Sequence, residues 1–77
     1  MSRHFTYEEA EAKVGTWVKT RVALAGAKAG VKAGTMGRVA KADKMRDGWG
    51  VVIYWDWPRT LHDLFTKDEY DHYLEEI

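Results

Sequence analysis

The stretch Trp49-Gly50-Val51-Val52-Ile53-Tyr54-Trp55 decides the fold, because β-branched and aromatic residues fill most of it. Such residues favour the extended conformation, and apolar side chains at both odd and even positions predict a strand that is covered on both faces. We therefore expect this segment to be the central strand of a small sheet. The strand is expected to end at Asp56 and Trp57-Pro58, since proline cannot continue a hydrogen-bonded ladder.

Two more strands are predicted upstream of this stretch. Met45-Arg46-Asp47-Gly48 predicts a tight hairpin turn in which Asp-Gly supplies positive φ angles. The turn would join the central strand to one that begins within residues 34–40, where the glycines mark positions at which backbones cross closely or the strand coils. Residues 16–22 alternate and predict a further strand, with Val18, Thr20 and Val22 on one face. Residues 23–34 carry a glycine at every fourth position towards their end, which argues against a helix and predicts a long loop.

Helix starts are predicted near both ends of the chain. The stretches Phe5-Thr6-Tyr7-Glu8-Glu9 and Phe65-Thr66-Lys67-Asp68-Glu69 each place a capping threonine three residues before a glutamate, with a phenylalanine in front. We expect a first helix over 7–14, ended by Gly15, and a closing helix over 67–76. Residues 61–65 predict a short strand before the closing helix. That helix would present one apolar stripe, made of Tyr70, Tyr73, Leu74 and Ile77.

Composition limits the chain, at 77 residues, to one domain with a modest core. No cysteine is present, which excludes disulfides and catalytic thiols and makes a reducing cytoplasm the expected location. No apolar run approaches the roughly 20 residues that span a bilayer, and no leader-like apolar stretch opens the chain, so no membrane contact is expected. Four Trp, four Tyr and two Phe supply the large apolar surfaces of the core.

The segment Gly34-Thr35-Met36-Gly37-Arg38-Val39 resembles the G-T-x-G-x-V element of SH3-like and KOW-like barrels. The closing stretch, residues 64–70, is similar to the end of small uncharacterised bacterial proteins that carry such a barrel. The resemblance implies a mainly β fold: an SH3-like barrel of four to five short strands over 16–65, with short flanking helices, forming a single domain over 1–77. KOW-like barrels imply RNA or ribosome contact, whereas other SH3-like barrels bind peptides, DNA or enzyme complexes. The polyproline-binding signature of signalling SH3 domains is lacking, so that role is not carried over to Trp49 or Trp55.

A catalytic site is not predicted. Asp68 and His72 lie one helical turn apart, a spacing typical of surface ion pairs, and the glycines match no phosphate-binding loop. Val51-Val52-Ile53-Tyr54 resembles the V-Q-I-Y strand of the plasmid-type dihydrofolate reductases, whose protomers are equally small SH3-like barrels. The glutamine that contacts ligands in that family is Val52 here, so the comparison gives no support for an enzyme. We expect no enzyme activity, no cofactor, no metal and no small-molecule ligand.

Charge is sorted along a chain whose net charge is zero. Residues 13–46 hold nine basic residues against one acid, whereas residues 47–77 hold eight acids against two basic residues. Either the molecule has a basic face and an acidic end, or the two ends fold back onto the basic middle, since order along the chain need not survive in space.

Tryptophans and basic residues together form the predicted binding surface. A sheet this small cannot bury every tryptophan, so at least one of Trp17, Trp49 and Trp57 is expected to be exposed to a partner, whereas Trp55 is expected in the core. The favoured partner is a protein or a second copy of the chain. Nucleic acid bound by the basic segment is the alternative. The complete candidate surface is Trp17, Lys19, Arg21, Lys28, Lys32, Arg38, Lys41, Trp49 and Trp57.

Overall fold

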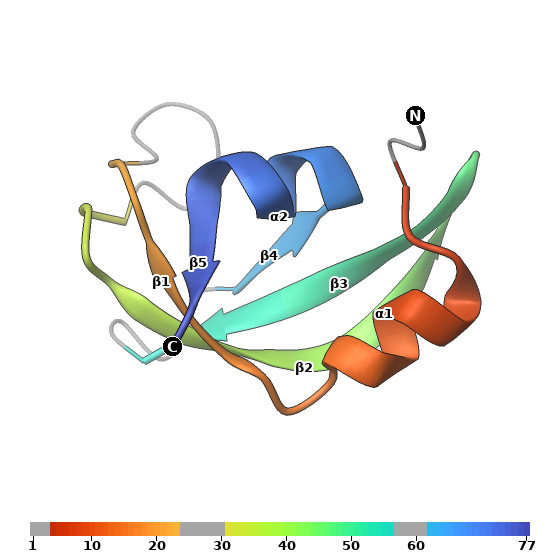
Figure 1. Cartoon of the computed structure of the whole chain (residues 1–77), viewed down its shortest axis with the longest axis horizontal. Helices are drawn as coiled ribbons and strands as arrows, with labels where there is room; N and C mark the ends of the chain where they lie inside the picture. The colour runs from red at the N-terminus through yellow and green to blue at the C-terminus, as the bar shows by residue number, and fades with distance from the viewer. Residues whose placement is uncertain (1–3, 24–30, 57–61) are drawn as a thin grey trace.

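The computed structural model describes residues 4–23, 31–56 and 62–77. Five antiparallel strands form one open sheet in the order β4-β3-β2-β1-β5, accompanied by two short helices (Figure 1). The predicted mainly β character is therefore confirmed. The elements in chain order are α1 (Tyr7–Lys13), β1 (Trp17–Thr20), β2 (Met36–Met45), β3 (Gly48–Trp55), β4 (His62–Phe65), α2 (Lys67–Tyr73) and β5 (Leu74–Glu76).

The hairpin between β2 and β3 forms where it is predicted, but the glycine at its turn has a different role from the one expected. Met45 pairs with Gly48 across the turn, and no described residue other than Gly15 and Gly34 has a positive φ. The expectation that Asp-Gly supplies positive φ is therefore wrong. A Cβ on Gly48 would lie 2.6 Å from Cβ of His4, so the glycine is needed because the N-terminal segment crosses the hairpin there. Phe5 then forms a bridge with Trp49.

The hairpin contains a β-bulge. Val39 pairs with Ile53, and the next pair in the ladder joins Lys41 to Val52, so that Ala40 has no opposite residue. A bulge bends its strand and shifts the phase of the side chains that follow it. β3 lies inside the sheet between β4 and β2, although β2 is the middle strand. Val51 and Val52 point to opposite faces of β3 and both are buried, as expected for a strand covered on both faces, whereas Tyr54 is 47 % exposed.

Both helices begin as predicted, but the second ends earlier. Thr6 and Thr66 form complete capping boxes with Glu9 and Glu69. The expected helix over 67–76 is wrong beyond Tyr73, because residues 74–76 form β5, which pairs with β1. One apolar stripe at helical spacing also fits a helix of about two turns followed by a strand. The free edge of β1 offers backbone partners that a helix would leave unpaired. Leu74 is accordingly buried, whereas Ile77 is 68 % exposed.

The core lies between the inner face of the sheet and the two helices. Val18, Val39, Val51, Ile53 and Trp55 contribute from the strands, and Ala10 of α1 and Tyr70 of α2 pack against them. Gly37 faces this core, and a Cβ there would lie 2.7 Å from side-chain atoms of both Ile53 and Trp55. Because both helices pack on the inner face, neither of them covers the other face of the sheet, where Tyr54 is exposed and Val52 is buried. The predicted loop over 23–34 falls mostly outside the described residues, although Val31 is buried.

Candidate interaction surfaces

The face of the sheet that neither helix covers carries one continuous row of side chains. Trp17 of β1 pairs with Arg38 of β2, Arg38 pairs with Tyr54 of β3, and Tyr54 pairs with His62 of β4. Directly paired residues of an antiparallel sheet point to the same face, so these four side chains cross four strands side by side. We call this side of the sheet the outer face. Besides the row, pairing and strand phase place on it Lys19, Met36, Lys41, Asp43, Met45, Val52, Asp56, Leu64, Glu75 and Ile77.

Ring contacts hold the row in place. The Arg38 guanidinium lies 5.9 Å from the centroid of the Trp17 ring, within the range of a cation–π contact. At the other end, the rings of Tyr54 and His62 are stacked, with centroids 5.2 Å apart and an interplanar angle of 17°. The row is therefore an ordered platform in which an arginine lies between two aromatic side chains.

Exposed apolar area is concentrated on the outer face. Seven large hydrophobic side chains are exposed in the described part of the chain, and four of them lie here: Trp17 at 44 %, Met36 at 41 %, Tyr54 at 47 % and Ile77 at 68 %. A fifth, Val14, lines a cavity of about 290 Å³ next to the row, together with Arg38, Val39, Ala40 and Tyr54. Clustered exposed apolar residues of this kind mark interaction sites more often than scattered ones do.

The structure brings four of the predicted surface residues together. Trp17, Lys19, Arg38 and Lys41 all lie on the outer face, and Lys41 lies there only because the bulge at Ala40 shifts the phase of the strand. The expectation that a tryptophan is exposed is confirmed by Trp17.

Other predicted surface residues lie elsewhere. Arg21 follows the end of β1 and donates from Nε to the carbonyl of Leu74 at 2.9 Å. Lys32 is exposed in the connection before β2. Trp49 is partly buried, with the Tyr7 ring 4.8 Å away. Lys28 and Trp57 are outside the described residues.

Sequence reasoning missed Tyr54, His62, Met36 and Ile77 as surface residues. For Tyr54 the signal was present, because strand alternation places it opposite the face that holds Ile53 and Trp55. For Ile77 no signal was present, since its position depends on β5 rather than on a helix.

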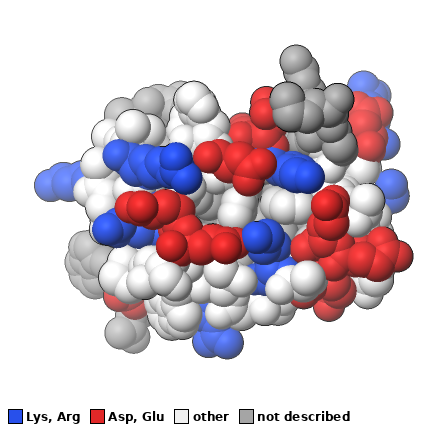
Figure 2. Space-filling model, viewed as in Figure 1, with Lys and Arg blue, Asp and Glu red and all other residues white. Residues whose placement is uncertain are grey.

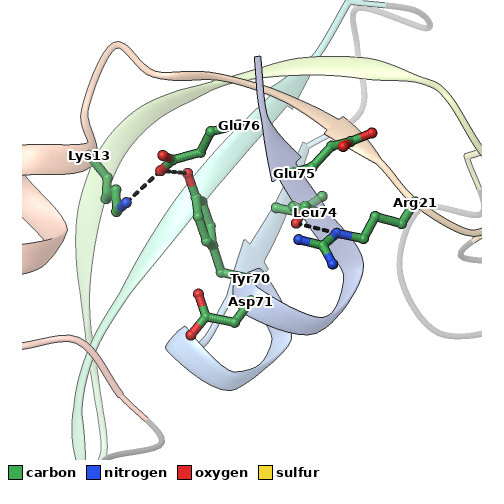
Figure 3. A pocket seen from close by; sticks show the side chains of 7 residues that line it. All are labelled: Lys13, Arg21, Tyr70, Asp71, Leu74, Glu75 and Glu76. Atoms are coloured by element: carbon green, nitrogen blue, oxygen red, sulfur yellow. Dashed lines mark hydrogen bonds and ion pairs between the residues drawn. The ribbon is translucent and has the colours of Figure 1, made fainter.

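A second hollow lies between α1, α2 and β5 (Figure 3). Its volume is about 350 Å³. The Tyr70 hydroxyl donates to Oε2 of Glu76 at 2.8 Å, and the Lys13 ammonium pairs with the same oxygen. Burial raises the pKa of Tyr70, and the hydrogen bond from Lys13 lowers the pKa of Glu76. These groups satisfy one another's hydrogen-bonding capacity, and their contacts attach β5 to both helices. The hollow is lined by Lys13, Arg21, Tyr70, Asp71, Leu74, Glu75 and Glu76.

Charges sorted along the sequence are mixed in space. Lys13 pairs with Glu76, and Lys19 pairs with Glu75 at 3.4 Å, so basic residues of the middle meet acids of the C-terminal end. Basic and acidic side chains are also interspersed over the left and centre of the face drawn in Figure 2, whereas acidic side chains gather at its lower right. Of the two interpretations of the charge pattern, these pairs favour the ends folding back onto the basic middle.

Within residues 4–23, 31–56 and 62–77, no group of three or more His, Cys, Asp or Glu side chains is arranged to hold a metal ion. Among the same residues, no helix has the length and apolar character that crossing a bilayer demands. No family model, curated protein or solved structure matches the chain.

Proposed function

We propose that this chain is a non-enzymatic, cytoplasmic binding module of SH3-like architecture that contacts a protein through its outer face. The SH3-like assignment is supported by the meander β2-β3-β4, by β1 and then β5 continuing the sheet beyond β2, and by the short helix that precedes the last strand. A reducing location is supported by the lack of cysteine.

The observation that carries the proposal is the grouping of Trp17, Met36, Arg38 and Tyr54 on one face that neither helix covers. Protein interfaces are enriched in aromatic residues, methionine and arginine relative to the rest of the surface. Tryptophan, tyrosine and arginine also supply most of the residues whose truncation costs the most binding energy. The row therefore has the composition of an interface centre, and the neighbouring cavity offers a place for a partner side chain.

Nucleic acid is the second candidate, favoured by Arg38 lying between two aromatic rings on which bases could stack. The charge of the outer face argues against it. By strand phase, Lys19, Arg38 and Lys41 share the face with Glu75, Asp43 and Asp56, so the basic and acidic side chains are equal in number among the residues that the structure describes. Nucleic-acid affinity depends on neutralising phosphates with excess positive charge, and the described residues of this face supply no such excess.

Site-specific photocrosslinking tests the proposed surface. A benzophenone amino acid is placed at Met36 on the outer face and, as a control, at Tyr7 on α1, which is similarly exposed at 48 %. In cells that naturally make the chain, position 36 should give discrete protein adducts that Tyr54→Ser removes, and position 7 should not. Adducts digested by nuclease would favour the nucleic-acid candidate. Equal labelling from both positions, or none from position 36, would overturn the proposal.

A further inference from the structure

We propose that the partner of the outer face is a second copy of this chain, paired about a twofold axis with Trp17 of each copy seated against the other. This inference rests on the proposed function, because it identifies the occupant of the same surface. Two properties of the outer face carry it: its balanced charge, and the presence of both an exposed indole and a cavity.

Balanced charge makes the outer face complementary to itself. Among the described residues of this face, Lys19, Arg38 and Lys41 are matched by three acids. Of these six, Lys19 and Glu75 are joined within one copy, at 3.4 Å between exposed groups. A strongly acidic partner would meet the carboxylates of this face, and a strongly basic one would meet its lysines and arginine. A twofold axis can instead place cations of each copy opposite acids of the other, because every contact in such an interface occurs twice.

Trp17 and the cavity supply complementary shapes on the same surface. The Trp17 side chain is 44 % exposed, and the cavity of about 290 Å³ begins at Arg38, its neighbour on β2, and extends to Tyr54. In an isologous interface every contact occurs twice. The indole of one copy would therefore fill the cavity of its partner, and the partner's indole would fill the cavity of the first copy. Arg38 already lies 5.9 Å from its own Trp17 ring, so a second indole in the cavity would contact the other side of the guanidinium.

Sedimentation equilibrium of the full chain tests this pairing. We expect a monomer–dimer equilibrium within about 1 μM to 1 mM, the range of modest protein interfaces. Trp17→Ser and Tyr54→Ser should each raise the dimer dissociation constant at least about tenfold, as truncation of central aromatic residues does. Tyr7→Ser is the matched control, because Tyr7 and Tyr54 are exposed at 48 % and 47 % and each contacts one ring. It should change the constant less than about twofold.

Near-ultraviolet circular dichroism establishes that each variant is folded, and Met36→Lys provides a second way to disrupt the surface should Trp17→Ser not fold. A chain that is monomeric throughout, or a dimer that Trp17→Ser, Tyr54→Ser and Met36→Lys leave unchanged, would overturn the inference. If the chain is monomeric but position 36 still crosslinks to a different protein, only the identity of the partner is wrong. If position 36 also gives no adduct, the proposed function fails as well.

Discussion

Gly37 shows how one missing side chain shapes the core. It pairs with Trp55 across the hairpin, and a Cβ would lie 2.7 Å from Cγ2 of Ile53 and from the Trp55 ring. The indole can therefore lie flat against β2 only because position 37 has no side chain. The sequence predicted closely crossing backbones or a coiled strand at the glycines of this segment, whereas the atoms nearest to a Cβ at Gly37 belong to the side chains of Ile53 and Trp55.

Gly37→Ala should lower the free energy of unfolding by about 1–3 kcal/mol, the usual cost of overpacking a core. Gly34→Ala serves as the control: a Cβ there meets open space, and the cost comes only from a φ of +84°, about 1–2 kcal/mol. Urea unfolding measures both. The near-ultraviolet signal of the tryptophans should change in Gly37→Ala and not in Gly34→Ala; a change in both variants would show that crowding at Trp55 is not the cause.

Trp55 is buried with its one polar atom satisfied, since Nε1 donates to Oδ2 of Asp63 on β4 at 2.7 Å. Asp63→Ala leaves this buried donor without that acceptor and should cost about 1–3 kcal/mol. Asp63→Asn keeps an oxygen in place and should cost less than half as much. Tryptophan fluorescence during urea unfolding gives both values. Equal losses in the two variants would mean that Asp63 acts through another contact.

At the scale of elements, the start of each helix could be predicted and the end of α2 could not. A capping box is local, because the threonine and the glutamate that form it are three residues apart. The change from α2 to β5 depends on Val18 and Lys19, more than fifty residues earlier in the chain, which offer the strand an edge to pair with. Sequence periodicity over one turn carries no information about such a distant partner.

The attachment of β5 should depend on pH. Lys13 and Tyr70 hold Glu76 as a carboxylate and lower its pKa below the ordinary value of 4.5. The stabilisation is therefore complete above about pH 4.5, where the unfolded chain is also ionised, and is lost as the pH falls through the lower pKa of the folded state. Because the side chain is 45 % exposed, Glu76→Gln should cost no more than about 1 kcal/mol at neutral pH.

Thermal unfolding between pH 3 and 7 tests this dependence. Glu76→Gln should flatten the fall in stability below about pH 4.5, because the group that takes up the proton is gone. Lys13→Met, which removes the main cause of the lowered pKa, should flatten it in part. The double variant should lose less stability than the two single variants added together. A pH profile identical to that of the parent chain would contradict the assignment.

At the scale of the whole molecule, the two ends of the chain are packed together. Phe5, before α1, meets the Tyr70 ring of α2 edge to face, with centroids 5.6 Å apart. Lys67 of α2 also lies 3.5 Å from a carboxylate oxygen of Glu9 in α1. The helices therefore close one core jointly rather than two separate ones.

Phe5→Ala should lower the free energy of unfolding by about 3–5 kcal/mol, as expected for truncation of a fully buried phenylalanine. Because the core is shared, far-ultraviolet dichroism and tryptophan fluorescence should still report one coincident transition. Tyr7→Ala, two residues away at an exposed position, is the control and should cost less than about 1 kcal/mol. Separate transitions for the two signals would show that the N-terminal segment unfolds independently.

The candidate site could be predicted only in part, because its residues come from four strands that are far apart in the sequence. Trp17, Lys19 and Arg38 were expected on the surface, and simple alternation or their residue type was enough to place them. Their meeting with Tyr54 and His62 depends on strand register, which no local pattern in the sequence fixes. Arg21 was expected on the same face, but it follows the end of β1, where alternation no longer applies.

The bulge at Ala40 has a consequence for how the chain tolerates changes in length. Nine residues, Gly37–Met45, run alongside eight, Gly48–Trp55, so the longer path must bow outward and the ribbon must curve. That curvature is set by residue count, and substitutions alone do not remove it. Deletion of Ala40 would leave every remaining side chain on its present face of the sheet but flatten the hairpin. Deletion of any one residue of β3 would instead move the side chains of part of the hairpin to the opposite face.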